Sequence, residues 1–423
     1  MTRVALLTAE PIRRRMAGIG IRYLELARRL PDFGLDVVLF TTGPPEEVPR
    51  EGLVSAVDVR PFERGQLARL LADCDVAVTQ GQVANDLLIE VPDLPTAVDF
   101  YDPFLVENFH YLDTLGLDPY RNDHATWVLQ LSRGDFFLCS CEEQRQYYLG
   151  FLTAVGRVNP HLVRDDPDLR SLIAVVPFGM SLEFGEPCPL LPERGVGEKR
   201  LLFGGLYDWY DPWPVLEALE RLDRPEWSLW LVRNPNPDGT PQKLFEEVRR
   251  WAEKRGFWET RLRTIDWVPA DRRYDLLRDA DLLVATHRSS LETRLSLRTR
   301  FLDALAIGRP VVTTEGGAIS RMLKESGAGW VVPERDPDAV AAAFQEILEG
   351  DPGLVEARCQ AGRQLAEAFA WDKVLEPLVT FCREPRQEST KTEFAASLAT
   401  AAPRDGLLFR LRRRWRRFLQ DRG

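Results

Sequence analysis

The chain alternates short runs of apolar residues with longer segments whose apolar positions repeat at helical spacing. Runs of the first kind predict β-strands. The first half of the chain contains seven of them, at residues 3–9, 36–42, 54–62, 76–81, 96–102, 136–141 and 173–179. Segments of the second kind predict amphipathic helices, as at residues 21–30, where Leu24, Ala27 and Leu30 lie along one face. Apolar strands separated by helices are typical of a parallel sheet that is covered on both faces.

The alternation is interrupted at residues 183–199, which are rich in Pro, Gly and charged side chains and which we interpret as an interdomain linker. Six further strands are predicted after it, at residues 200–207, 228–234, 262–268, 282–287, 310–316 and 329–334. The sequence therefore predicts two tandem Rossmann-like doubly wound α/β domains, at residues 1–182 and 200–368, with a ligand-binding cleft between them. Residues 369–385 predict a helix that returns to pack on the N-terminal domain.

Size and composition agree with this organisation and exclude some classes of function. A chain of 423 residues is too long for one ordinary core. Its net charge of −10 argues against a nucleic-acid-binding protein. The six cysteines form no Cys-x-x-Cys pair, and we interpret them as small buried hydrophobes in a reducing cytosol. The first apolar run is too short for a signal peptide, and no run of about 20 apolar residues predicts a membrane span. We expect a cytoplasmic protein.

In doubly wound folds, ligands bind beyond the carboxyl ends of the strands, so the residues that follow each strand are the candidates. After the first strand, Gly18 and Gly20 precede a helix with Arg22 near its start. A glycine turn at a helix N-terminus can bind phosphate or another anion, although a plain strand-to-helix turn explains the two glycines equally well. Asp102 follows the fifth strand, where its carboxylate would face the cleft. The alternative is that Asp102 caps the next helix.

In the second domain, residues 203–214 and 233–237 follow the first two strands. Gly205 would let a ligand approach the backbone, and Trp209 can stack on a ring, although Trp is also an ordinary interface residue. A polar loop after the fourth strand places His287, Glu292 and Arg294 on the cleft side.

Arg298 stands at the start of the next predicted helix, where a cation is unfavourable next to the helix dipole. Its position therefore predicts a neighbouring anion, which is either a bound ligand or Glu292. A surface cluster of salt bridges is the alternative interpretation of this loop.

Several of these segments resemble one enzyme family. The segment "FLDALAIGRPVVTTEGG" (301–317) resembles the donor-binding segment of the GT-B glycosyltransferases of family 4, and "GIGIRYLELARRLPDFGLDVVLFTT" (18–42) resembles the N-terminal signature of that family. "LLFGGLYDWYDPWPVLEAL", "RNPNP" and "ETRLSLRTRFLD" together resemble a bacterial branch linked to surface polysaccharides. The resemblance covers about residues 1–380 in order.

The chain departs from the family pattern at three points. The family has two glutamates separated by seven residues. Here the first position is Leu295 and the second is Asp303. The usual Arg and Lys after the first strand of the second domain are absent. We infer that Arg298 or Arg300 supplies positive charge for the diphosphate instead.

The resemblance implies transfer of a sugar from a nucleoside-diphosphate sugar, with retention at the anomeric carbon, to a glycan or polyprenyl-linked acceptor. It implies no bound metal and no cofactor, because the nucleotide sugar is a substrate. The candidate catalytic residues are Asp102, His287, Glu292 and Asp303, and the candidate donor-binding residues are Gly18, Gly20, Arg22, Gly205, Asp208, Trp209, Arg233, Asn234, Arg294, Arg298 and Arg300.

Two Asp-x-Asp strings, at residues 73–75 and 279–281, lie at the amino ends of predicted strands, away from the cleft, and are poor candidates for a metal site. Two other functions remain open. One is a nucleotide-sugar epimerase, which needs no acceptor. The other is a non-catalytic GT-B subunit that binds sugar or a partner protein, which the departures from the family pattern favour.

The C-terminus has a different composition. Residues 386–406 are small and polar and predict a flexible linker. Residues 407–423 predict a basic amphipathic helix, in which Leu407, Leu411, Trp415 and Phe418 share one face and six arginines cover the remainder. This composition is typical of a helix that lies on an anionic membrane surface, here the inner face of the membrane. Docking to a protein partner is the alternative.

Overall fold

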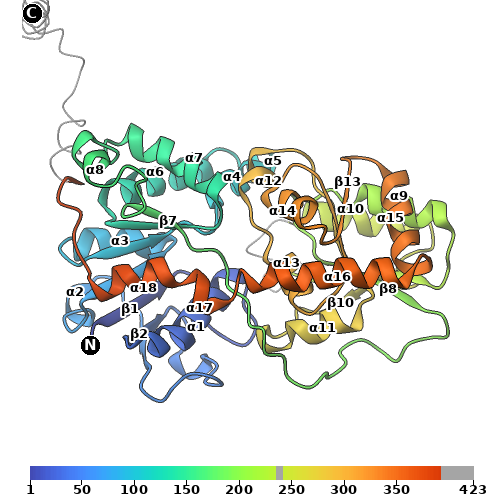
Figure 1. The fold of residues 1–423 in the computed structure, drawn as a ribbon, viewed down its shortest axis with the longest axis horizontal. Helices are drawn as coiled ribbons and strands as arrows, with labels where there is room; N and C mark the ends of the chain where they lie inside the picture. Colours follow the sequence, from blue (N-terminus) through green and yellow to red (C-terminus); the bar gives the residue numbers. More distant parts are fainter. Residues whose placement is uncertain (235–241, 392–423) are drawn as a thin grey trace, which may run out of the picture.

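The computed structural model of the chain describes residues 1–234 and 242–391, which form two parallel β-sheets, each covered by helices (Figure 1). The N-terminal sheet has seven strands in the order β3-β2-β1-β4-β5-β6-β7, and the C-terminal sheet has six in the order β10-β9-β8-β11-β12-β13. Both are doubly wound, because the chain builds outward from the first strand in one direction and then in the other. The predicted fold class is confirmed.

Each predicted apolar run contains a strand, and the strands are shorter than the runs. Those of the N-terminal sheet are β1 Arg3–Thr8, β2 Asp36–Thr41, β3 Asp58–Pro61, β4 Val76–Gln80, β5 Thr96–Asp99, β6 Phe136–Cys139 and β7 Ile173–Val175. Those of the C-terminal sheet are β8 Lys199–Gly205, β9 Trp227–Val232, β10 Leu262–Ile265, β11 Leu282–Ala285, β12 Val311–Thr314 and β13 Trp330–Val332.

The N-terminal sheet is covered by α1 Gly18–Arg29, η1 Leu30–Phe33, η2 Pro45–Glu47, α2 Leu67–Leu70, α3 Gln82–Glu90, α4 Phe104–Glu107, η3 Asn108–Tyr111, α5 Leu112–Leu115, α6 Asp118–Arg133, α7 Glu142–Ala154 and α8 Pro160–Asp165. The C-terminal domain contains α9 Trp213–Leu222, α10 Lys243–Lys254, η4 Ala270–Arg272, α11 Arg273–Asp279, α12 Leu291–Leu295, α13 Thr299–Ala306, α14 Ala318–Ser326, α15 Pro337–Glu349 and α16 Pro352–Glu367.

Alternating side chains of the N-terminal strands fill two separate cores. In β1, Val4 and Leu6 belong to the core that α1 covers, whereas Ala5 and Leu7 belong to the core on the opposite face. Successive residues of a strand point to opposite faces, so a strand that is buried on both faces must be apolar at every position. This is why the strands could be predicted as unbroken apolar runs.

The chain crosses between the domains twice, and the two crossings touch. The segment after β7 leaves the N-terminal domain at Met180, whose amide donates to Phe369 O at 2.6 Å, where the chain returns. Beyond Met180 the predicted linker packs on the C-terminal domain, with the amides of Leu190 and Leu191 donating to Asp279. Lys199, the last residue of that predicted linker, belongs to strand β8 instead.

The returning segment comprises two helices, α17 Trp371–Val374 and α18 Glu376–Arg383, in line with α16 (Figure 1). Its predicted contact with the N-terminal domain is present, since Phe381 stacks on Phe136 at 4.9 Å between ring centroids. The first residues of the predicted flexible linker differ from expectation. Glu388 and Lys391 both bind Asp135, which ties them to the N-terminal domain. The predicted amphipathic helix at 407–423 lies outside the described residues.

A substitution at the crossing tests how tightly the returning segment is packed. A Cβ atom at Gly179 would overlap the indole of Trp371. We expect Gly179→Ala to lower the free energy of unfolding by about 1–3 kcal/mol, because neither the backbone nor the ring has room to move. Urea denaturation measures the change. Gly150→Ala is the matched control, because a Cβ there meets nothing within 4 Å, and it should leave stability unchanged or increase it.

None of the helices in the described parts of the chain is long and apolar enough to cross a membrane.

Candidate active site

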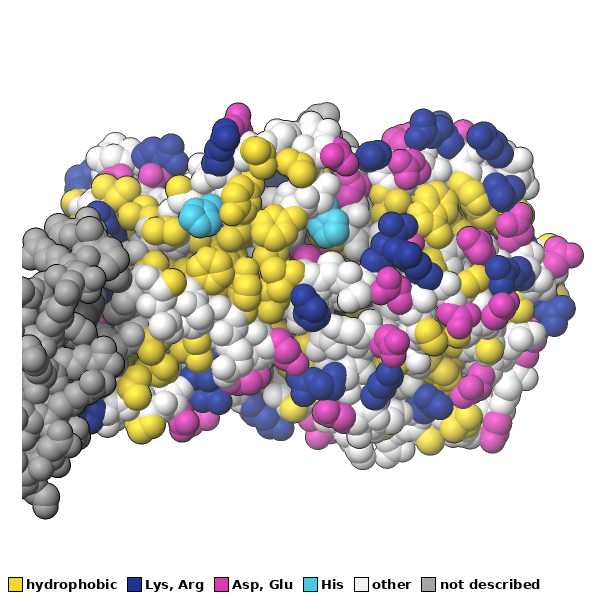
Figure 2. Space-filling model, turned by 90° about the horizontal axis from the view of Figure 1, so that it is seen from above, with side chains coloured by type: hydrophobic (Ala, Val, Ile, Leu, Met, Phe, Trp, Pro, Cys, Tyr) yellow, Lys and Arg dark blue, Asp and Glu magenta, His cyan; other side chains and the backbone are white. Residues whose placement is uncertain are grey.

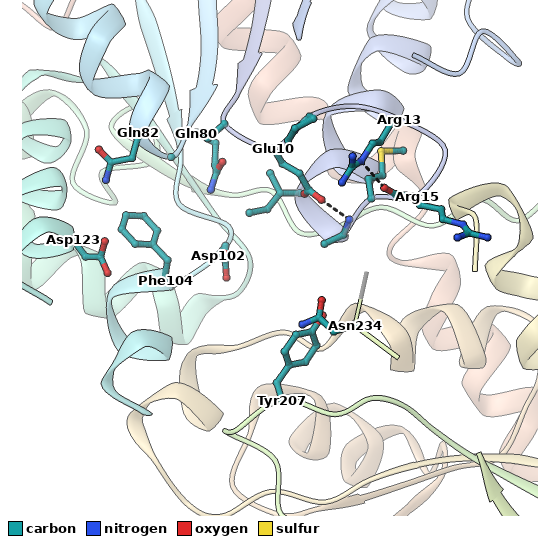
Figure 3. A pocket seen from close by; sticks show the side chains of 16 residues that line it. Glu10, Arg13, Arg15, Gln80, Gln82, Asp102, Phe104, Asp123, Tyr207 and Asn234 are labelled. Carbon is teal, nitrogen blue, oxygen red and sulfur yellow. Dashed lines mark hydrogen bonds between the residues drawn. The ribbon is translucent and has the colours of Figure 1, made fainter. Parts of the chain in front are cut away.

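Three adjoining cavities, of about 490, 260 and 120 Å³, lie between the domains at the carboxyl ends of both sheets. All three are lined by Tyr207, which follows β8. The largest is formed by the loops after β1, β4 and β5 together with Tyr207 and Asn234 of the C-terminal domain (Figure 3). The cavities therefore form one cleft at the switch points of both sheets, where the sequence places the ligand.

Gly18 and Gly20, predicted to precede the helix, lie in the first turn of α1, whose amides bind a carboxylate of the chain itself. Glu10 accepts hydrogen bonds from the amides of Ala17 and Gly20, the latter at 2.6 Å. Burial raises the pKa of Glu10, and the two amide hydrogen bonds lower it in part. The prediction that Gly20 binds an anionic ligand is therefore wrong, because its amide already has an anionic partner. Gly18 does line the cleft, in the 260 Å³ cavity.

Arg22 is a structural residue of the N-terminal core. Its side chain is fully buried, and it pairs with Asp99 at 2.7 Å. Its other nitrogens donate to the carbonyls of Val176 and Pro177. The prediction that Arg22 binds the donor is wrong, because the guanidinium ties α1 to β5 and to the segment after β7 and does not reach the cleft.

Asp102 faces the cleft beside a second acid, Glu107. The two side chains hydrogen bond to each other, and both line the 120 Å³ cavity. The pKa of Asp102 is raised to about 6, mainly by burial; the hydrogen bond with Glu107 lowers it in part, and the charges of Glu292 and Glu10 contribute to the rise. Burial and the charge of Asp102 raise the pKa of Glu107 well above its usual range. The pair therefore shares one proton at neutral pH, so it can both accept and donate hydrogen bonds.

The raised pKa of Asp102 predicts a pH-dependent stability. The unfolded chain releases this proton near pH 4, but the folded protein keeps it until about pH 6. The folded state thus binds more protons in this window, and the free energy of unfolding should fall as the pH rises through it. We expect Asp102→Asn to raise stability at pH 7 by on the order of 1–2 kcal/mol and to leave it nearly unchanged at pH 4.

Urea denaturation at pH 4, 5, 6 and 7 measures this change. Asp93→Asn, at an exposed carboxylate, is the control and should give no such difference. An Asp102→Asn protein that loses stability at pH 7 would contradict the shared-proton description.

Arg298 and Glu292 form a buried ion pair on the opposite side of the cleft. Their side chains are 8% and 1% exposed, and Arg298 Nη2 lies 2.6 Å from Glu292 Oε2. Of the two anions predicted for Arg298, Glu292 is the one present. Glu292 itself lines none of the cavities described above, so its direct role in catalysis stays a prediction. It positions Arg298, which does line the 120 Å³ cavity.

Arg300 lines the cleft with its guanidinium fixed by backbone carbonyls. It donates to Phe203 O and Gly205 O, both at 2.9 Å, and lies over the Tyr210 ring. Gly204 has a φ of +81°, a left-handed conformation that favours glycine, and a Cβ atom there would lie 2.8 Å from Arg300 Nη1. Arg298 and Arg300 therefore place positive charge opposite the acid pair of Asp102 and Glu107.

His287 lies beneath the floor of the cleft. It is 3% exposed and packs against the Tyr210 and Phe301 rings. Burial and the charge of Arg298 lower the pKa of His287 well below its usual range, so the ring is neutral. It lines none of the cavities described. Its catalytic role therefore stays a prediction, and the contact that the structure shows is its packing against Tyr210.

Asp303 lines the 260 Å³ cavity and pairs with Arg273 at 3.2 Å. Burial raises its pKa, while Arg273 and a hydrogen bond with Tyr274 lower it. The same cavity contains Gly205, Trp267 and Arg300. It therefore combines apolar walls with a carboxylate and a guanidinium, as a nucleoside diphosphate requires.

The aromatic residues after β8 form a stack at the cleft. Trp209 lies parallel to Tyr207, with ring centroids 4.7 Å apart. Asp208 accepts the amide of Leu244, and with Trp209 it lines a fourth cavity of about 380 Å³. Both predicted residues thus lie at the cleft, but Asp208 also holds the start of α10.

The remaining candidates differ in position. Asn234 lines the 490 Å³ cavity. Arg233 donates to Thr264 Oγ1 at 2.8 Å, and it lies at the outer edge with Asp266. Arg294 is exposed and lines none of the cavities described, so its contact with the donor stays a prediction.

Sequence reasoning missed Glu10, Glu107, Tyr207 and Arg273. Glu107 lies five residues after Asp102, in the first helix after the same strand, and this position was a signal. Glu10 and Arg273 gave none. Glu10 binds amides in the first residues of α1 and its N-cap, which no side-chain pattern marks, and Arg273 pairs with Asp303, 30 positions away.

The Asp-x-Asp strings serve the backbone. Asp75 accepts the amide of Arg3, and Asp281 accepts the amide of Arg200. Within residues 1–234 and 242–391, no group of three or more His, Cys, Asp or Glu side chains is arranged to hold a metal ion.

Comparison with known proteins identifies the C-terminal domain. A family described as glycosyl transferases group 1 matches residues 199–350. These residues are a glycosyl transferases group 1 domain. The fold of the described residues is that of the GT-B glycosyltransferases, as in sucrose-phosphate synthase from Thermosynechococcus elongatus (TM-score 0.61, 14% identity, 91% of this chain and 99% of that one). Anabaena HepE in complex with UDP-glucose has a TM-score of 0.62 at 14% identity and covers 95% of this chain and 100% of its own.

Curated relatives match the chain over shorter lengths. WcaL of Salmonella typhimurium is 27% identical over 123 residues, which are 26% of this chain and 30% of WcaL. The amylovoran biosynthesis glycosyltransferase AmsK of Erwinia amylovora is 23% identical over 128 residues, which are 29% of this chain and 31% of AmsK. The matched part thus spans less than a third of these relatives.

Proposed function

We propose that the chain is a retaining glycosyltransferase, similar to family 4, that moves a sugar from a nucleoside-diphosphate sugar to a glycan or lipid-linked acceptor in the synthesis of cell-surface polysaccharide. The observation that carries this proposal is the cleft, in which Arg298 and Arg300 of the group 1 domain face Asp102 and Glu107 of the N-terminal domain. AmsK, by its name, acts in polysaccharide biosynthesis, and HepE was solved with UDP-glucose.

The donor would bind with its nucleoside in the 260 Å³ cavity, against Trp267 and near Asp303. Its diphosphate would then lie at the start of α13, where Thr299 and Arg300 line the cavities. The sugar would extend into the 120 Å³ cavity, toward Asp102. The positive end of α13 and the two arginines favour a diphosphate at this place.

In the reaction, the bond from the anomeric carbon to the diphosphate oxygen breaks and the acceptor oxygen bonds to the same carbon. Negative charge develops on the diphosphate, and Arg298 and Arg300 stabilise this charge. Neither arginine needs to reorganise, because Glu292 already fixes Arg298 and two backbone carbonyls already fix Arg300. The acceptor proton passes to the leaving diphosphate. The acid pair of Asp102 and Glu107 orients sugar hydroxyls by accepting and donating hydrogen bonds. No step requires a metal ion.

The test is incubation of the full chain with radiolabelled nucleotide sugars and a lipid-linked acceptor, with and without EDTA. Transfer of label to the acceptor, with the α-configuration of the donor retained, supports the proposal. Conversion of the donor in the absence of acceptor indicates an epimerase. Binding without turnover indicates a non-catalytic subunit, a function that the engagement of Arg298 by Glu292 also accommodates.

We also propose that the protein works at the inner face of the membrane through residues 407–423. Sedimentation with anionic vesicles, comparing the full chain with one that ends at Gln387, tests this. Both forms remaining in the supernatant at low salt would favour a protein partner.

A further inference from the structure

A short segment at the mouth of the cleft exposes an unusual number of large apolar side chains. Helix α5 (Leu112–Leu115) has no buried residue, although it begins and ends with leucine. Its leucines are 52% and 50% exposed. Three nearby side chains, Phe109, Leu117 and Tyr120, are similarly exposed. We call these five residues, Phe109, Leu112, Leu115, Leu117 and Tyr120, the apolar patch. The Phe109 and Tyr120 rings are 5.8 Å apart, which makes the patch continuous across η3 and α6.

Figure 2 shows hydrophobic side chains gathered on this face of the molecule, the face on which α4, α5, α6 and α7 lie in Figure 1. Exposed apolar side chains that are scattered singly need no explanation, but a contiguous patch marks an interaction site.

The residues between the members of the apolar patch face a polar cavity. His110, Asp113 and Thr114 line the 380 Å³ cavity, and across it lie Lys243, Arg288 and Trp209 of the C-terminal domain. One short segment therefore presents alternate side chains to two environments, a polar cavity that is continuous with the cleft through Trp209 and an apolar surface outside it. A molecule with a polar head and an apolar tail is complementary to both.

The charged residues around the apolar patch favour a hydrocarbon chain over an anionic lipid surface as its ligand. Asp113 and Asp118 are its acidic neighbours, and Arg121 is paired with Asp118 at 3.2 Å. An anionic lipid surface is attracted by unpaired Lys and Arg side chains, which this segment does not offer. A hydrocarbon chain needs no charge. The 380 Å³ cavity combines the cations Lys243 and Arg288 with the acids Asp113, Asp208 and Glu247, so it offers hydrogen-bond donors and acceptors to an uncharged polar head. Arg288 is itself paired with Asp211 at 3.2 Å.

We infer that the apolar patch binds the hydrocarbon chain of a lipid-linked acceptor, whose polar head enters the 380 Å³ cavity. This inference rests on the proposed glycosyltransferase function and names the class of its acceptor.

The experiment uses the full chain and two probes with the same head, dodecyl β-glucoside and butyl β-glucoside, below the concentration at which the first forms micelles. The double variant Leu112→Ser/Leu115→Ser changes the apolar patch. The matched control is Val54→Ser/Val163→Ser, which changes two side chains of the same domain that are 42% and 39% exposed. All four side chains are exposed, so both variants should keep the melting temperature of the parent.

We expect dodecyl β-glucoside to bind the parent and the control at least about tenfold more tightly than butyl β-glucoside, because eight additional methylene groups leave water. The patch variant should lose this difference and keep the affinity for nucleoside diphosphates. Equal binding of the two probes by the parent, or an undiminished preference in the patch variant, overturns the inference.

Two further outcomes also overturn it. If the parent is a dimer that the patch variant dissociates, a second copy of the chain covers the patch. If neutral phosphatidylcholine vesicles bind the parent and not the variant while the dodecyl probe distinguishes neither, the patch meets a bilayer. Loss of nucleoside diphosphate binding in every form would instead count against the proposed function, independently of the probes.

Discussion

The variant Arg22→Met is expected to lose about 3–5 kcal/mol of folding free energy, because it leaves a buried carboxylate without its partner. Asp99 is 1% exposed at its side chain and faces Arg22 at 2.7 Å. The carbonyls of Val176 and Pro177 would lose their donors at the same time. Chemical denaturation followed by circular dichroism measures the change in the N-terminal domain.

Two controls separate burial from charge. Arg164→Met removes an arginine from an ion pair with Asp165 whose side chains are 70% and 67% exposed, and it should cost no more than about 1 kcal/mol. The double variant Arg22→Met/Asp99→Asn should recover part of the loss, since it leaves no charge buried. A loss of less than about 1 kcal/mol in Arg22→Met would show that the pair is not important for stability.

The second large effect is expected on catalysis. Arg298→Met should lower kcat for sugar transfer by roughly 10²–10³-fold, because it removes a fixed positive charge from the place where the diphosphate develops negative charge. It should also destabilise the domain, because Glu292 is then buried without a partner. Activity and stability must therefore be measured on the same protein.

The double variant Arg298→Met/Glu292→Gln distinguishes the two effects. It should restore much of the stability, because both charges are gone, but not the activity. Arg294→Met is the matched control, since that arginine is exposed and outside the cavities, and its activity should stay within about twofold of the parent. If the double variant recovers full activity, Arg298 has only a structural role and another group stabilises the diphosphate.

The fold could be predicted from the sequence because its strands are local patterns. Eleven of the thirteen strands in the described residues lie within predicted apolar runs, and β8 and β9 each begin one residue before theirs. Strands that are buried on both faces contain apolar residues throughout. The ends of the strands were predicted too long. Residues 177 and 178 continue the apolar run after β7, but Pro177 has no amide to donate to a neighbouring strand.

The candidate site could be predicted only where a residue follows its strand directly. Asp102 was found in this way. Arg22 was misassigned because its partners, Asp99 and the carbonyls of Val176 and Pro177, are 77 to 155 positions away in the chain. A buried arginine and a ligand-binding arginine have the same appearance in a helical pattern. For Arg298 the sequence did indicate a neighbouring anion, because the unfavourable helix position required one.

The two touching crossings at Met180 and Phe369 have a mechanical consequence. Two domains joined by a single flexible segment can rotate in any direction. Two segments that cross side by side restrict the motion to rotation about a hinge. The line through the two crossings is then the axis of interdomain rotation. Sliding or twisting of one domain against the other would strain one of the two crossing segments. Arg298 and Arg300 of the C-terminal domain can thus approach Asp102 and Glu107 of the N-terminal domain by one rotation. The distance from Arg298 to Asp102 therefore measures how far the cleft is open.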